Sequence, residues 1–145
     1  MNRRRSERGS APLEMVLAVG FLLIPAMTLL AQLPTWVAAH HAAQSAAVEA
    51  ARADVLADTM AEGADDANTV AAAVLINHEL GGSALVGVSV SATPSGELTW
   101  GQEVTVSVSV AGPQIVVPGL GAVGDPFTVT RSSTERVDDY RSLSP

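Results

Sequence analysis

A single carboxylate, Glu14, stands directly before a long stretch of the chain that carries no formal charge. This uncharged stretch covers residues 15–39 and is mostly apolar. A charged group on a lipid-facing helix costs about 2.5–3.5 kcal/mol at the bilayer centre and less near the interface. Such a group usually has a cationic partner, because pairing offsets the cost of removing both charges from water. The chemistry that Glu14 offers is therefore ion pairing.

A basic segment, residues 1–9, precedes this carboxylate. It contains half of the basic residues of the chain, namely Arg3, Arg4, Arg5 and Arg8. We interpret them as a topology anchor that keeps a cytoplasmic leader inside, so that the rest of the chain crosses the membrane. Gly9 and Ser10 follow as a junction of small residues, and together with the apolar stretch this arrangement is typical of an export and membrane-insertion segment. From Ser10 onward, 14 acidic residues and 4 arginines leave a formal charge of −10, which argues against nucleic-acid binding.

Other residues that could bind a metal or catalyse a reaction are poorly arranged. His40 and His41 are adjacent, so on a helix their side chains do not converge, and His78 is the only other histidine. The acidic pair Asp65 and Asp66 is not followed by the alternating oxygen ligands of a calcium loop. The chain has no cysteine, and no nucleophile–base–orienter set can be assembled. We therefore expect no metal, no cofactor and no enzymatic activity.

The uncharged stretch is long enough to span a bilayer. As a helix, residues 15–39 would extend about 37 Å, at about 1.5 Å per residue, and a hydrocarbon core is about 30 Å thick. We place the transmembrane helix at residues 10–39. Pro25 and Pro34 each remove a backbone donor and should kink or loosen this helix. Trp36 is expected in the aromatic belt at the outer interface.

Two helical segments are predicted up to residue 80. Residues 40–60 are rich in alanine, whose high helix propensity predicts that the first helix continues through them. Gly63 and the two aspartates that follow it are expected to break this helix. A second helix is predicted at residues 69–80, with Asp66 or Asn68 as its N-cap.

The hydrophobic period then changes from helical to alternating. Apolar residues, nearly all valine, alternate with small or polar residues in three runs, at 86–90, 104–110 and 127–130. Alternation of this kind predicts half-buried strands, and residues 93–96 provide the turn of an antiparallel hairpin. Residues 113–126 are expected to form a loop, and residues 138–145 a flexible tail. The predicted class is α+β, with an extracytoplasmic domain at residues 40–137. Its small antiparallel three-stranded sheet needs cover, which the extramembrane half of the first helix can supply.

The N-terminal pattern resembles the class III signal of type IV pilins and pseudopilins. After a cut between Gly9 and Ser10, Glu14 becomes the fifth residue of the chain. In that family a prepilin peptidase makes this cut, and the carboxylate at the fifth mature position pairs with the N-terminal amine of a neighbouring subunit. The resemblance implies Gly9 and Ser10 as the processing site and Glu14 as the assembly contact. It also implies other pilin or pseudopilin subunits as partners, which we expect to meet residues 115–120.

Further residues narrow the resemblance to one branch of these proteins. The order Arg-Gly-Ser-Ala and then Glu in residues 8–14, followed by Pro25, looks like the opening of TadE-like proteins. These are minor pseudopilins of the tight-adherence (Flp) pilus system. Residues 46–52 are similar to their Gly-Ala-Arg-like element, with Ala50 in place of glycine, and the strand and Pro/Gly loop at 104–121 also fit. The resemblance implies a pilin-like fold and a non-enzymatic, single-pass subunit of a pilus assembly or secretion machine in the cell membrane.

Two other interpretations fit the same residues. Glu14 can be an ordinary interfacial carboxylate near the start of its helix, where the helix dipole favours an anion. The segment can also be an ordinary secretory signal, cut between Ala39 and His40, which would release a small secreted β-rich binding module. The uncharged stretch is longer than the roughly 7–15 residues typical of such signals. The mass of the mature chain and its partition into membranes distinguish these interpretations.

Overall fold

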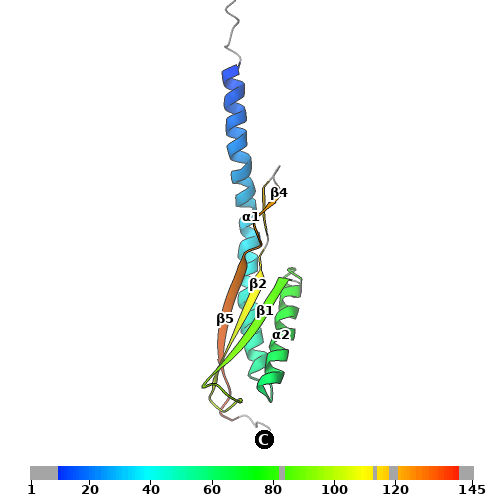
Figure 1. Ribbon diagram of the computed structural model, residues 1–145, viewed down its shortest axis with the longest axis vertical. Coiled ribbons are helices and arrows are strands. Elements are labelled where there is room, and N and C mark those ends of the chain that lie inside the picture. The colour runs from blue at the N-terminus through cyan, green and yellow to red at the C-terminus, as the bar shows by residue number, and fades with distance from the viewer. Residues whose placement is uncertain (1–9, 82–83, 113, 118–120, 141–145) are drawn as a thin grey trace, which may run out of the picture. The chain divides into compact units, whose positions relative to one another are not determined.

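The structure is α+β, as the sequence predicts. The computed structural model describes residues 10–81, 84–112, 114–117 and 121–140. Figure 1 shows the elements in chain order: α1 (Ser10–Asp54), α2 (Met60–Asn77), β1 (Leu85–Thr93), β2 (Glu103–Ala111), β3 (Ile115–Val117), β4 (Gly121–Val123) and β5 (Thr128–Arg136). The long apolar N-terminal helix, the second helix and the antiparallel sheet are thereby confirmed.

Contacts within the chain divide it into two units. The N-terminal unit combines Met1–Leu33 with Gln114–Asp125, so it holds the first part of α1 and the strands β3 and β4. The sheet unit combines Pro34–Pro113 with Pro126–Pro145, so it holds the rest of α1, α2 and the strands β1, β2 and β5.

The first helix is continuous over 45 residues. It runs through both Pro25 and Pro34 without a break in its helical assignment. The prediction that it continues to about residue 60 is wrong, because α1 ends at Asp54. There the hydrogen bonding tightens from the α-helical to the 3₁₀ pattern: the Leu56 N–H donates to the Ala53 carbonyl at 3.1 Å.

The second helix begins earlier than predicted because it has a different cap. Thr59 is the N-cap, and its Oγ1 accepts a hydrogen bond from the Glu62 N–H at 3.2 Å. The Glu62 carboxylate in turn accepts one from the Asp58 N–H at 3.3 Å. This reciprocal arrangement is close to a capping box, which satisfies the free donors at the start of a helix. Thr-x-x-Glu in the sequence was the signal for it.

Residues expected to interrupt the helices therefore lie inside α2. Gly63 and the aspartates Asp65 and Asp66 all have helical conformation. Gly63 is buried, and a Cβ at this position would collide with the Asp54 side chain. The close packing of this position against Asp54 therefore explains why residue 63 is a glycine. Asp66 and Asn68 are exposed and cap nothing, since the cap is supplied upstream.

The principal sheet has three strands in the order β1-β2-β5, all antiparallel. β1 and β2 form the predicted hairpin, with Val88 opposite Val108 and Val90 opposite Val106. β5 continues to Arg136, well beyond the predicted end at residue 130. The expected loop at 113–126 is partly wrong, because β3 and β4 pair there as a small antiparallel hairpin.

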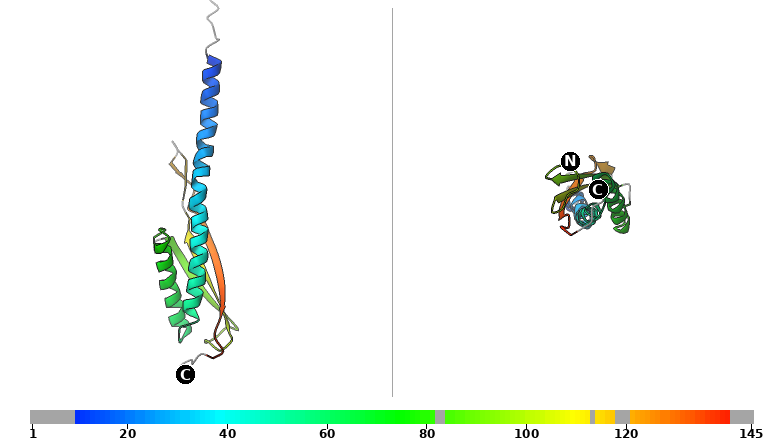
Figure 2. Two further views of the ribbon diagram at one scale, coloured as in Figure 1. Left: turned by 180° about the vertical axis from the view of Figure 1, so that it is seen from behind. Right: turned by 90° about the horizontal axis from the view of Figure 1, so that it is seen from below.

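The core of the sheet unit is built from a stripe of alanines. The buried residues of α1 recur at spacings of three and four, which is one face of a helix: Ala39, Ala42, Ala43, Ala46, Ala47, Ala50, Ala51 and Asp54. Most of these alanines join one cluster with the β2 valines and with Ala67, Ala71 and Leu75 of α2. In Figure 2 this part of α1 and α2 lie side by side against one face of the sheet. The expectation that the first helix covers the sheet is confirmed.

The other face of the sheet carries side chains with hydroxyl groups. Three cross-strand pairs join β2 to β5 with oxygen–oxygen distances of 2.7–2.9 Å: Thr105 with Thr134, Ser107 with Ser132, and Ser109 with Thr130. The two faces of β2 therefore differ chiefly in whether a side chain ends in a hydroxyl.

Candidate functional site

Glu14 is exposed on α1, just past the first turn of the helix. That first turn contains no acidic residue, so Glu14 lies beyond the position where the helix dipole favours an anion most strongly. The carboxylate has no hydrogen-bond or ion-pair partner among the described residues. It is therefore open to a cation from beyond the described residues, and the dipole gives little support to a purely interfacial role.

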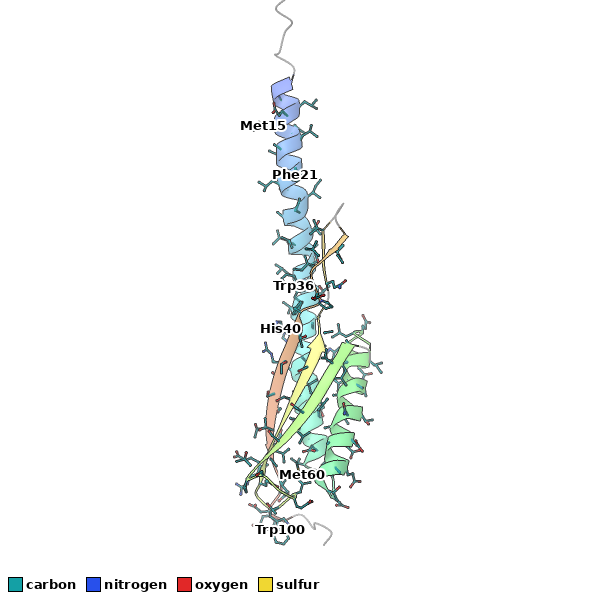
Figure 3. The ribbon with its side chains drawn as sticks, viewed as in Figure 1. Met15, Phe21, Trp36, His40, Met60 and Trp100 are labelled. Carbon is teal, nitrogen blue, oxygen red and sulfur yellow. The ribbon has the colours of Figure 1, made fainter. Side chains whose placement is uncertain are left out.

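The helix around Glu14 presents apolar side chains that the chain itself does not cover. The span Pro12–Asp54 is long and apolar enough to cross a membrane, and no part of its most apolar window is buried. Phe21 is 84% exposed and Met15 is 70% exposed, and Figure 3 shows both projecting away from the helix. The core helix of a soluble protein would be mostly buried, so this surface needs another apolar environment.

The other predicted site residues lie at or before the start of the described chain. Ser10 is the first residue of α1. The topology arginines Arg3, Arg4, Arg5 and Arg8, and Gly9 of the processing site, lie outside the described residues. The proposed cut therefore falls at the N-terminal boundary of the helix that carries Glu14.

Gln32 forms a contact that sequence reasoning missed. Its side-chain amide makes two hydrogen bonds to the backbone of Val116 in β3: the Val116 N–H donates to Oε1 at 3.0 Å, and Nε2 donates to the Val116 carbonyl at 3.1 Å. The amide thus satisfies the edge of β3 as a neighbouring strand would. One sequence feature could have indicated that Gln32 makes a specific contact: it is the only amide side chain in the uncharged stretch 15–39.

An aromatic pair lies within the sheet unit. Trp36 of α1 and Phe127 meet edge to face, with ring centroids 5.8 Å apart and an interplanar angle of 72°. The Gly112 N–H donates to the Phe127 carbonyl at 2.7 Å, and a Cβ on Gly112 would collide with the Phe127 ring. Trp36 is half-buried, so the residue expected in an aromatic belt also packs within the sheet unit.

The three histidines are not brought together. His40 lies 3.0 Å from Arg131 through its Nδ1, and His41 is exposed on α1. His78 follows the end of α2 and lines an open, largely apolar hollow together with Thr35 and Ala111. Among the described residues, no group of three His, Cys, Asp or Glu side chains is placed to hold a metal ion.

Asp54 is a buried carboxylate at the last residue of α1. Its side chain is fully buried, and neither oxygen has a hydrogen-bond partner among the described residues. Burial raises the pKa of this carboxyl, because the charged form loses its hydration. Its position at the C-terminal end of a helix also disfavours an anion. Asp54 is on the same face as the buried alanines, which the sequence could have shown from its spacing alone.

Comparison with protein-family models, with curated proteins and with solved structures finds no match to this chain. The described residues themselves define a class: an α+β protein with an uncovered apolar N-terminal helix that continues into the core of its sheet unit.

Proposed function

We propose that this chain is a membrane-anchored minor pseudopilin-like subunit of a tight-adherence (Flp) pilus assembly or secretion machine. Arg3, Arg4, Arg5 and Arg8 hold the N-terminus in the cytoplasm, and the sheet unit is extracytoplasmic. A prepilin peptidase cuts between Gly9 and Ser10, and Glu14 then pairs with the N-terminal amine of another pilin-like subunit. The subunit acts by assembly and not by catalysis.

The observation that carries this proposal is the state of Glu14 on α1. The carboxylate is exposed and unpartnered among the described residues, and it lies in an apolar surface that the chain leaves uncovered. In a membrane an unpaired carboxylate is costly, while a neighbouring amine would offset that cost. An assembly contact would explain both why the carboxylate is exposed and why the apolar helix is left uncovered.

The continuity of α1 supports retention of the apolar helix over secretory release. A cut between Ala39 and His40 would fall inside α1, next to a fully buried alanine. It would also remove Trp36 from its contact with Phe127. Exposed loop tips are the preferred sites of proteolysis, whereas this position is helical and part of a packed unit.

The processing step is tested by mapping the N-terminus of the mature chain. We expect the native protein to begin at Ser10, and Gly9→Leu to block removal of the leader, because the proposed peptidase requires a small residue there. Ala39→Leu serves as the matched control and should leave the mass of the mature chain unchanged except for the substitution. A native chain that begins at His40 would instead show a released, secreted module.

A further inference from the structure

We infer that the hairpin of β3 and β4 is a second membrane-contact element, seated at the outer headgroup–acyl boundary of the bilayer beside α1. The inference rests on the proposed membrane insertion of α1 and adds a lipid-binding role for the strands β3 and β4. The partner that we assign to the surface of this hairpin is the lipid bilayer.

The hairpin is attached to the apolar part of the helix by its backbone. Val116 and the Gln32 amide exchange two hydrogen bonds of 3.0 and 3.1 Å. The hairpin and this part of α1 belong to the same unit. A side-chain amide near lipid is costly unless its donors and acceptors are paired, and so is a strand edge. Each group satisfies the other, so the pair can lie where water is scarce.

The composition of the hairpin suits lipid. No charged residue occurs between Glu103 and Asp125. Val116 is 50% exposed and Val123 is 48% exposed, so apolar side chains of both strands remain uncovered. A two-stranded ribbon is marginal in water unless its apolar surface packs against something.

The position of Gln32 along α1 sets the depth. Gln32 follows Met15 by about 26 Å of helix, at about 1.5 Å per residue, and the hydrocarbon core is about 30 Å thick. An open strand edge does not occur within the hydrocarbon core. The hairpin therefore lies at the outer boundary, with its apolar side chains toward the acyl chains and its free edge in reach of water.

A protein partner on the same surface is less favoured by the residues present. Protein interfaces usually have a polar rim around their apolar centre, and the hairpin has no charged residue to form one. Gln32 itself is flanked on α1 by the exposed side chains of Leu29 and Leu33. The surface around the attachment point is thus the same uncovered surface that the membrane must cover.

The absence of cysteine makes a depth measurement straightforward. Single-cysteine variants of the full chain, each labelled with the fluorophore NBD, would be reconstituted into phosphatidylcholine–phosphatidylglycerol vesicles. Val123→Cys reports on the hairpin, Leu23→Cys on the middle of the exposed apolar helix, and Ser89→Cys on the exposed face of β1. Lipids that carry a nitroxide near the headgroup or deep in the acyl chain quench NBD according to its depth.

We expect Val123→Cys to be quenched most strongly by the shallow nitroxide and to emit at shorter wavelength than Ser89→Cys, which should resemble a label in water. Strong quenching of Leu23→Cys by the deep nitroxide shows that α1 is inserted. If Leu23→Cys is quenched but Val123→Cys behaves like Ser89→Cys, the inference is overturned while the membrane anchor stands. If Leu23→Cys is not quenched, the anchor fails, and the hairpin role with it.

A second variant tests the attachment itself. Gln32→Leu removes both hydrogen bonds to Val116 but makes the helix more apolar, so insertion should not fall. We expect the Val123→Cys label to lose at least half of its shallow quenching in this background. Gln44→Leu, on an exposed position of α1, is the matched control and should change nothing. A shift of the Val123→Cys emission to shorter wavelength that appears only after a pilin-like subunit is added, without quenching by either nitroxide lipid, would show that the surface binds protein instead.

Discussion

Glu14 and Asp54 are both carboxylates without a partner in the described part of the chain, but their surroundings are opposite. Glu14 is exposed on an uncovered apolar helix, whereas Asp54 is fully buried between helices. An exposed charge can be satisfied by another molecule. A buried charge without a donor is a cost within the fold, because its hydration is lost and nothing replaces it. The two residues therefore call for different measurements.

For Glu14 we expect an effect on assembly and none on anchoring. Glu14→Ala removes a charge from the membrane helix, so retention in the membrane should not fall. The free energy of binding to pilin-like subunits should weaken by about 1–3 kcal/mol or more, since the partner amine is left unpaired. Co-purification with these subunits should fall accordingly. Glu14→Gln separates charge from shape. Unchanged partner binding in both variants would show an ordinary interfacial residue.

The proposed contact between Glu14 and a neighbouring amine can also be tested by carbodiimide coupling, which joins a carboxylate to an amine in contact with it. The chain has no lysine, so the only amine that it can contribute is its N-terminal one. In intact assemblies we expect a cross-linked peptide between Glu14 and the N-terminal residue of a neighbour, and its loss in Glu14→Gln. Cross-links from other carboxylates without one from Glu14 would contradict the pairing.

For Asp54 we expect an effect on stability that depends on pH. The carboxyl has a raised pKa in the fold, so the fold favours its protonated form. The native chain is then most stable, relative to an uncharged variant, below the ordinary carboxyl pKa of roughly 4. This stability is lost as the pH rises through the raised pKa. Asp54→Asn should therefore stabilise the chain at neutral pH, by about 1–3 kcal/mol.

The measurement is thermal unfolding of the full chain in detergent between pH 4 and pH 8. The advantage of Asp54→Asn should shrink toward pH 4. Asp65→Asn changes the charge equally at an exposed position of α2 and should stay within about 0.5 kcal/mol of the native chain. An Asp54→Asn advantage that does not vary with pH would mean that ionisation is not its cause.

Single residues differed in how far the sequence could reveal them. Glu14 could be identified as a candidate from the sequence, because a single charged residue directly before a long uncharged stretch is unusual. Asp54 was hidden among several acidic residues, and only its spacing from the buried alanines distinguishes it. Gln32 was not identified, since its partner Val116 lies far away in the sequence and the contact depends on a hairpin that the loop-like composition of residues 113–126 concealed.

At the scale of elements, the close approach of α1 and α2 is set by Gly63. An alanine there would bring its Cβ against the Asp54 side chain and within 3.0 Å of the Asp54 carbonyl oxygen. Alanine is favoured over glycine in a helix by about 1 kcal/mol, but overpacking costs about 1–3 kcal/mol. We expect Gly63→Ala to lower the free energy of unfolding by up to about 2 kcal/mol, the overpacking cost less that gain.

Denaturant unfolding of the full chain checks this expectation. Gly20→Ala is the matched control, because Gly20 is also a helical glycine but its Cβ position has no packing neighbour within 4 Å beyond the adjacent residues and backbone of its own helix. Stabilisation by Gly63→Ala would show that Asp54 can move aside. In that case the buried carboxylate is less confined than the packing indicates.

Element types followed from the sequence more readily than element ends. The alternating valines predicted β1 and β2 because each strand has one buried face, and period two is a direct consequence. The end of α1 and the start of α2 were misplaced, because alanine propensity does not mark where a helix stops. Thr59 and Glu62 did mark the start of α2, but glycine and aspartate downstream suggested a break that tertiary packing does not produce.

At the scale of the whole molecule, the prediction concerns topology. The arginines precede the only candidate membrane span among the described residues, so the positive-inside rule places the C-terminus outside the cytoplasm. A phosphatase fused after Pro145, active only outside the cytoplasm, should be active, and a fluorescent protein that needs the cytoplasm should be dark. The reverse pattern would remove both the pilin-like and the secretory interpretation. Replacing the four leader arginines with glutamate should weaken or invert the pattern.

The hydroxyl pairs on the outer face of the sheet have a consequence for folding fidelity. Along β2, valine alternates with serine or threonine, and threonine has nearly the shape of valine. A slip of one residue in strand pairing would exchange the two faces, and the shapes alone would resist it weakly. The slip would bury the oxygens of Thr105, Ser107 and Ser109 and separate them from Thr134, Ser132 and Thr130. Three side-chain oxygens on one strand thus help decide which register the sheet adopts.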